Sequence, residues 1–220
     1  MTENVRGSGL ALIFGSLIII VTLILHPTER GLFDPAQVES VGRTIIVVHS
    51  LALLSLPLLF LGACGLWRGV GSNKRLGLAG LVIYGFALAA MMNALIIDGL
   101  VTPGLARAIV NATADKAVGW KIAFNHNVLL DQAFMSVFLV ASSVAIALWS
   151  LAMVGSAALV RALGIFGFLF GAAAVIGQLS GWLSQYPNLF GVVLIGQAIW
   201  FSCAGVQLWR GRSSVEGEEK

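Results

Sequence analysis

Residues 44–67 read TIIVVHSLALLSLPLLFLGACGLW, an apolar run that contains no Asp, Glu, Lys or Arg and a single histidine, His49. A helix needs about 20 such residues to cross the hydrocarbon core of a membrane. Five other stretches meet this requirement. The sequence therefore predicts six transmembrane helices, at about 8–26, 44–67, 76–98, 125–150, 161–183 and 189–209.

The composition agrees with a chain whose surface faces lipid. Hydrophobic residues make up 58% of the sequence and charged residues only 10%, whereas soluble domains average roughly 25% charged residues. We expect an all-α integral membrane protein, with a six-helix bundle over 1–212 and a disordered acidic cytoplasmic tail over 213–220. The lipid bilayer is the expected partner. Nucleic acid is not, because the basic residues lie in short loops between apolar runs.

The distribution of basic residues predicts the orientation. Lys and Arg number 13 in total, and an arrangement with both termini in the cytoplasm (N-in/C-in) places eight inside and five outside, as the positive-inside rule requires. The inside group is Arg6, Arg68, Lys74, Arg75, Arg161, Arg210, Arg212 and Lys220. We expect a multi-pass protein of the cell (inner) membrane. The arrangement resembles that of uncharacterised bacterial membrane proteins, a resemblance that implies no function.

Two outer segments, 27–43 and 99–124, are long. In the second, Leu105, Ile109 and Ala112 have helical spacing, which predicts a short amphipathic helix on the membrane surface. A plain connector is the alternative.

The six helices can be grouped into three helical hairpins, because every second helix closes with Leu-Trp at 66–67, 148–149 and 208–209. Trp at a helix end is typical of the membrane interface, where its ring is apolar and its N–H meets water or headgroups. A true repeat and convergence on membrane rules both explain the pattern.

Small residues predict which helix faces pack together. Gly164, Gly167, Gly171 and Ala174 recur at helical spacing on one face, and such stripes let helix backbones approach closely within lipid. Gln178 continues this stripe at its outer end. Asp98 ends a similar stripe on 76–98, so both polar side chains should point into the bundle.

Histidines and acids gather at the outer ends of the helices. His26 ends the first helix, His49 lies near the start of the second, Asp98 ends the third, and His126 and Asp131 lie near the start of the fourth. Taken singly, His26 can sit among headgroups, His126 can belong to a helix cap and Asp98 can bond a loop. His49 and Asp131 are harder to explain structurally, because ionisable groups within membrane helices usually face a cavity or a partner.

Together these side chains suit a metal. Imidazole and carboxylate are ligands for Zn, Fe or Cu, so we predict a divalent metal held by His49, His126 and either His26 or Asp98. Asp131 would be a general base, a further ligand or a residue that orients an imidazole. Asn127, Asn93 and Gln178 would surround the site, with Asn127 supporting Asp131. A haem with His49 and His126 as axial ligands fits less well, since Asp131 would be an awkward neighbour. No motif such as HExxH supports the metal.

Two functions follow from this pattern. The first is a membrane-embedded metal-dependent enzyme or redox protein, whose site near the outer face acts on an apolar substrate such as a lipid or quinone-like molecule. The alternative is a non-catalytic subunit of a larger membrane complex, structural or binding a pigment or lipid, with other membrane subunits as partners. A transporter fits less well, because the polar residues form no continuous path to the inside.

Overall fold

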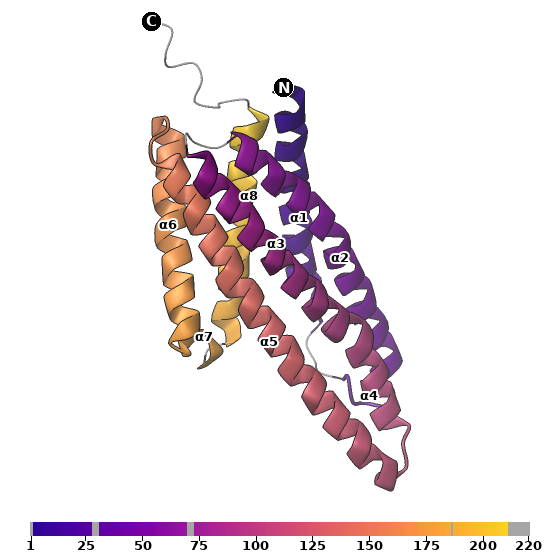
Figure 1. The fold of residues 1–220 in the computed structure, drawn as a ribbon. Coiled ribbons are helices and arrows are strands. Elements are labelled where there is room, and N and C mark those ends of the chain that lie inside the picture. The colour runs from indigo at the N-terminus through magenta and orange to yellow at the C-terminus, as the bar shows by residue number, and fades with distance from the viewer. Residues whose placement is uncertain (1, 28–30, 70–72, 186, 211–220) are drawn as a thin grey trace, which may run out of the picture.

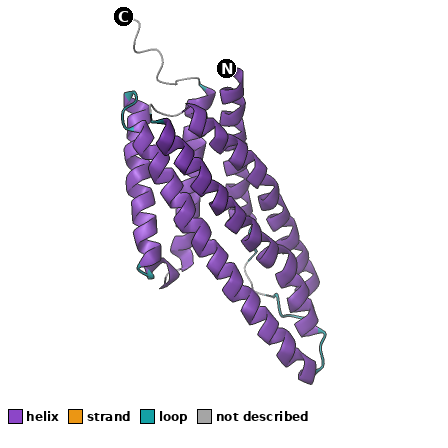
Figure 2. Cartoon of the chain, in the orientation of Figure 1, coloured by secondary structure: helices purple, strands orange, loops and turns teal. Residues whose placement is uncertain are grey.

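The computed structural model describes residues 2–27, 31–69, 73–185 and 187–210, and every regular element among them is a helix (Figures 1 and 2). In order they are α1 (Thr2–Leu25), α2 (Val38–Gly69), α3 (Lys74–Ile96), a π-helical segment η1 (Ile97–Val101), α4 (Thr102–Val110), α5 (Ala114–Met153), α6 (Ala158–Leu179), α7 (Trp182–Gln185) and α8 (Pro187–Trp209). Six spans are long and apolar enough to cross a membrane, which confirms the predicted all-α membrane fold. The predicted acidic tail, 213–220, lies outside the described residues.

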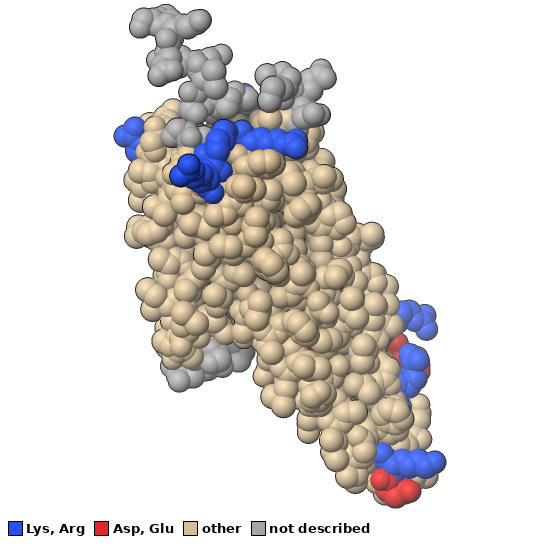
Figure 3. Space-filling model, in the orientation of Figure 1, with Lys and Arg blue, Asp and Glu red and all other residues tan. Residues whose placement is uncertain are grey.

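The helices pack side by side in the order α8, α1, α2, α3, α5, α6. We call the end where α1 begins and α8 ends the proximal end, and the opposite end the distal end (Figure 1). Charged side chains lie at these two ends, and the surface between them in this view is uncharged, as a lipid-facing belt requires (Figure 3). The N-in/C-in orientation and the three-hairpin repeat stay predictions.

Three helices are longer than a membrane requires. α5 has 40 residues, a length of about 60 Å at 1.5 Å per residue, against a hydrocarbon core of about 30 Å. At the distal end, α2, α4 and α5 extend past the ends of α6 and α8 (Figure 1). Arg107 on α4 pairs with Glu39 on α2 through contacts of 2.6 and 2.9 Å, which ties two of these extensions together.

The expectation of a long connector over 99–124 is wrong. α3 continues through η1 into α4, and α5 already begins at Ala114. The amphipathic helix predicted from Leu105 and Ile109 exists as α4, as a continuation of α3. Hydropathy detects the part of a helix that lies in lipid, whereas the helix itself continues as long as its residues favour helical backbone, so its ends were underestimated.

The Leu-Trp position of Trp149 suggested an indole ring exposed to the membrane interface, but the structure packs this ring inside the bundle. Its side chain is fully buried, and its indole N–H donates to the carbonyl oxygen of Gly77 at 3.0 Å. A Cβ at Gly80 would lie 2.7 Å from the indole nitrogen. The glycines of α3 therefore create the space and supply the acceptor that let a tryptophan enter the core.

The small-residue stripe of α6 packs against α5, as predicted. Gly164, Gly167 and Gly171 are all buried. A Cβ at Gly171 would lie 2.6 Å from the backbone oxygen of Ser143, and one at Gly164 would lie 2.8 Å from that of Ser150. Because backbone atoms cannot move aside as a flexible side chain does, these positions set the distance between the two helices.

We expect Gly171→Leu to destabilise the bundle, because the new side chain would collide with the α5 backbone, and overpacking of this kind costs about 1–3 kcal/mol or more. Thermal unfolding in detergent measures the effect. The matched control is Gly104→Leu on α4, where a Cβ would meet nothing within 4 Å. Equal melting temperatures for the two variants would show that α6 does not depend on this close approach.

Candidate functional site

A cavity of about 740 Å³ lies between the distal ends of the helices. All six spans and the short α7 contribute to its walls, so residues far apart in the sequence meet there. Most of the lining is apolar, and the polar side chains that reach it are Thr22, His26, His49, Asp98, Asp131, Gln132, Ser136 and Gln178. The cavity therefore combines an apolar interior with a few polar groups, as binding sites for small molecules do.

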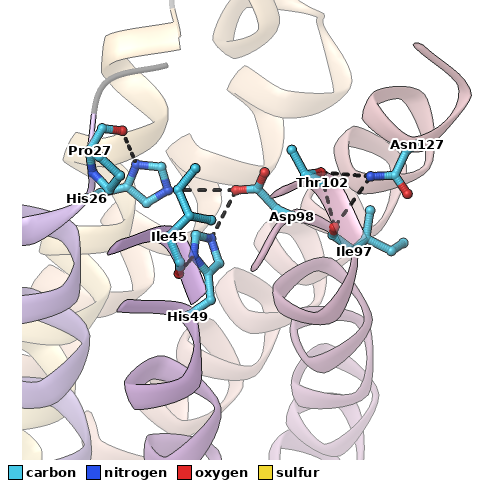
Figure 4. Close-up of polar contacts among 8 residues, drawn as sticks. All are labelled: His26, Pro27, Ile45, His49, Ile97, Asp98, Thr102 and Asn127. Carbon is cyan, nitrogen blue, oxygen red and sulfur yellow. Dashed lines mark hydrogen bonds and ion pairs between the residues drawn. The ribbon is translucent and has the colours of Figure 1, made fainter. Parts of the chain in front are cut away.

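Three of the predicted residues converge on one wall of this cavity. The Nε2 atom of His49 lies 3.0 Å from Oδ2 of Asp98, and Nε2 of His26 lies 3.7 Å from the same oxygen (Figure 4). The two imidazole rings meet edge to face at 5.1 Å. We call His26, His49 and Asp98 the triad. His26 is the residue that follows α1, His49 belongs to α2 and Asp98 belongs to η1.

The triad atoms are spaced as metal ligands are. One ligand atom from each residue lies within 4.8 Å of the other two. Around a tetrahedral metal with ligands at about 2.0–2.1 Å, neighbouring ligand atoms are about 3.3 Å apart, a value between the two observed contacts to Asp98. The three side chains therefore form a group that could hold a metal ion after small adjustments.

The backbone orients both imidazoles toward Asp98. Nδ1 of His49 lies 2.8 Å from the carbonyl oxygen of Ile45, and Nδ1 of His26 lies 3.0 Å from that of Pro27 (Figure 4). A carbonyl oxygen only accepts hydrogen bonds, so Nδ1 carries the proton in both rings. Each Nε2 atom is thereby turned toward Asp98, which is how histidine ligands are usually held.

Gly99 brings the two helices of the triad together. A Cβ at this position would lie 2.1 Å from Cβ of His49, so no other residue fits without moving α2 away from η1. His49 is buried, with only 4% of its surface exposed. The glycine that follows Asp98 is thus the reason that Asp98 reaches a buried imidazole.

The π-helical turn that carries Asp98 is fixed by α5. The carbonyl oxygen of Ile97 accepts hydrogen bonds from the backbone N–H and the hydroxyl of Thr102, and from the amide of Asn127 at 3.4 Å. The same amide donates to the Thr102 hydroxyl at 2.8 Å (Figure 4). Single π-turns within α-helices are rare overall, and those that occur are often found at functional sites.

The other predicted site residues are not members of the triad. Asp131 and Gln178 line the same cavity from α5 and α6. Asn127 does not hydrogen-bond to Asp131 but supports the turn before Thr102. Asn93 is exposed and donates to Ala89 of its own helix.

His126, expected as a metal ligand, is exposed and outside the triad. The adjacent Asn127 faces the bundle, and consecutive helical residues point about 100° apart, so His126 is directed away from it. Gly99, Thr102 and Ser136 were not expected at the site. The position of Gly99 directly after Asp98 was the one signal in the sequence that could have indicated a close contact.

Comparison of the chain with protein-family models, with curated proteins and with solved structures finds no match.

We expect Gly99→Ala to separate His49 from Asp98, because the added methyl group needs the space that Cβ of His49 fills. The nitrogen and proton shifts of ¹⁵N-labelled His49 report the hydrogen bond directly. Gly104→Ala, five residues further along the same continuous helix and in open space, is the control. An unchanged His49 signal in Gly99→Ala would contradict this role for the glycine.

Proposed function

We propose that the protein is a membrane-embedded metal-dependent enzyme or redox protein, with a divalent metal held by the triad. The convergence of His26, His49 and Asp98 within 4.8 Å on a cavity wall is the observation that carries the proposal. Both imidazoles direct their Nε2 atoms toward the shared carboxylate, and a metal ion bound there would replace the protons that otherwise join these atoms.

The ligand set favours a catalytic over a structural metal. Two imidazoles and one carboxylate leave coordination positions open, as in catalytic zinc sites and in non-haem iron sites. The cavity lies next to these positions. A metal there would polarise or bind the polar group of a molecule in the cavity, which is what a Lewis acid or redox centre needs.

The cavity favours an apolar substrate, such as a lipid or quinone-like molecule. Leu23, Met91, Leu95, Phe190 and Leu194 are among its lining residues, and their apolar surface suits the hydrocarbon part of such a substrate. Asp131 lines the same cavity and makes no hydrogen bond to any described residue. We assign it the transfer of a proton to or from the bound substrate.

The basic residues support an outward-facing site. Described Lys and Arg side chains of the predicted inside group, such as Arg68, Lys74 and Arg75, belong to the proximal ends of their helices. The positive-inside rule then places the proximal end in the cytoplasm and the cavity near the outer face. A location in the inner membrane of a bacterial cell stays a prediction.

The first test is elemental analysis, with an absorption spectrum, of protein purified in detergent. We expect about one metal ion per chain, lost in His49→Ala and in Asp98→Ala, because each removes a ligand. His126→Ala is the matched control and should retain the metal, since this histidine lies outside the triad. A wild-type protein free of metal when purified and after incubation with Zn, Fe or Cu would instead favour a non-catalytic lipid- or pigment-binding subunit.

We also expect metal binding to release protons and to weaken as the pH falls. The 3.0 Å contact between His49 and Asp98 requires a proton between the two atoms, and a metal would take its place. At lower pH, protons compete for the same Nε2 atoms, so the affinity decreases. Titration calorimetry with Zn²⁺ in buffers of different ionisation enthalpy counts the released protons. An affinity that does not change with pH would contradict ligation by these imidazoles.

A further inference from the structure

The cavity has a second polar wall, apart from the triad. Asp131, Gln132 and Ser136 lie along α5, and Gln178 lies near the end of α6. The mechanism proposed above uses only Asp131 from this group. We call Asp131 and Gln178 the acceptor wall, because both offer oxygen atoms that can accept hydrogen bonds.

Hydrogen bonds determine which atoms of this wall remain for a ligand. The Ser136 hydroxyl donates its proton to the backbone oxygen of Gln132 at 2.8 Å. Its contact of 3.0 Å with Gln178 must therefore be donated by the Gln178 amide nitrogen. The amide oxygen of Gln178 is left as an acceptor with no donor among the described residues.

Asp131 offers the same chemistry. No described residue donates a hydrogen bond to its carboxyl group, and a carboxyl group accepts hydrogen bonds in either protonation state. Two half-buried acceptors on one wall of an apolar cavity favour a ligand that brings hydrogen-bond donors to them. Hydroxyl groups meet this need and add no charge.

The charge of the lining disfavours an anionic head group in the metal-free protein. Asp98 and Asp131 both line the cavity, and no Lys or Arg is among the described residues that do. In the metal-free protein the two imidazoles are already paired with Asp98, so a phosphate or a carboxylate beside Asp131 would meet an acidic side chain without a Lys or Arg to balance it. The rest of the lining is mainly aliphatic, aromatic and thioether surface, which suits a hydrocarbon body.

We propose that the cavity binds a neutral amphiphile, whose hydroxyl-bearing head group donates hydrogen bonds to Asp131 and Gln178 and whose apolar body packs against Met91, Phe190 and Leu194. A volume of about 740 Å³ accommodates a ligand with a head group and a medium-length chain. The position of the head group beside the triad rests on the proposed function. The hydrogen bonds to the acceptor wall do not require a metal.

Two kinds of molecule have this chemistry, and their binding is measured with purified full-length protein in nanodiscs containing a chelator. The probes are decylhydroquinone, an aromatic diol, and 1-decanoylglycerol, a neutral lipid. Each is compared with its O-methylated form, which keeps the body and loses the hydroxyl donors. Decanoate serves as the anionic amphiphile.

We expect at least one hydroxyl probe to bind about tenfold or more tightly than its methylated form, which corresponds to about 1.4 kcal/mol. The tighter of the two identifies the head group as aromatic or glycerol-like, and either result supports the proposal. Asp131→Leu and Gln178→Leu should reduce this preference to about twofold or less. Asn93→Leu, an exposed position outside the cavity, is the control and should retain it.

Equal binding of hydroxyl and methylated forms, or tighter binding of decanoate, would overturn the proposal. The same holds if both variants keep the wild-type preference. Because the chelator removes metal from every sample, these results do not depend on the metal test. A hydroxyl preference in a protein that never binds metal would leave this inference intact and remove the proposed metal chemistry.

Discussion

The close approach of α2 to the π-helical turn at Gly99 is the constraint on which the site depends. Without a side chain at Gly99, Cβ of His49 lies against the backbone of η1, and Asp98 reaches the imidazole at 3.0 Å. Asp98 continues the inward-facing stripe of α3 and lies in the π-turn that follows it. Asn127 and Thr102 hold the carbonyl oxygen that this turn would otherwise leave weakly bonded. The triad therefore forms because the backbones of α2 and η1 come close together, and not only because its members can carry opposite charges.

Several polar side chains deeper in the bundle are hydrogen-bonded between helices. Gln197 on α8 donates to Ser143 and accepts from Ser142, both on α5, at 2.9 and 3.0 Å. The indole N–H of Trp149 is bonded to Gly77. Since lipid supplies no hydrogen bonds, each of these groups depends on a partner from another helix. The cavity differs, because Asp131 and the amide oxygen of Gln178 face an open volume.

The arrangement at the distal end also bears on how a ligand would reach the cavity. α1, α6 and α8 end near its level, whereas α2, α4 and α5 continue beyond it (Figure 1). On one side of the cavity, therefore, the helices continue beyond its level. Exposed apolar side chains on this extension, among them Val118, Trp120 and Ile122, are compatible with contact with lipid headgroups or another subunit.

Part of this protein could be derived from its sequence. Long apolar runs determine six spans, because hydropathy alone decides what a bilayer accepts. The glycine spacing in α6 correctly indicated the face that packs on α5, since helical periodicity places those residues together. His26, His49, Asp98 and Asp131 were recognised as one polar layer from their positions near the helix ends.

Only the tertiary structure decided which of these residues meet. His126 and Asn127 are neighbours in sequence, yet one is exposed and the other clamps η1, because a helix turns about 100° per residue and its rotation is set by packing. The continuity of α3 through η1 was hidden for a similar reason, since a π-turn depends on contacts with α2 and α5 that no local pattern contains. Sequence determined the six apolar spans, whereas the rotation and spacing of the helices determined the site.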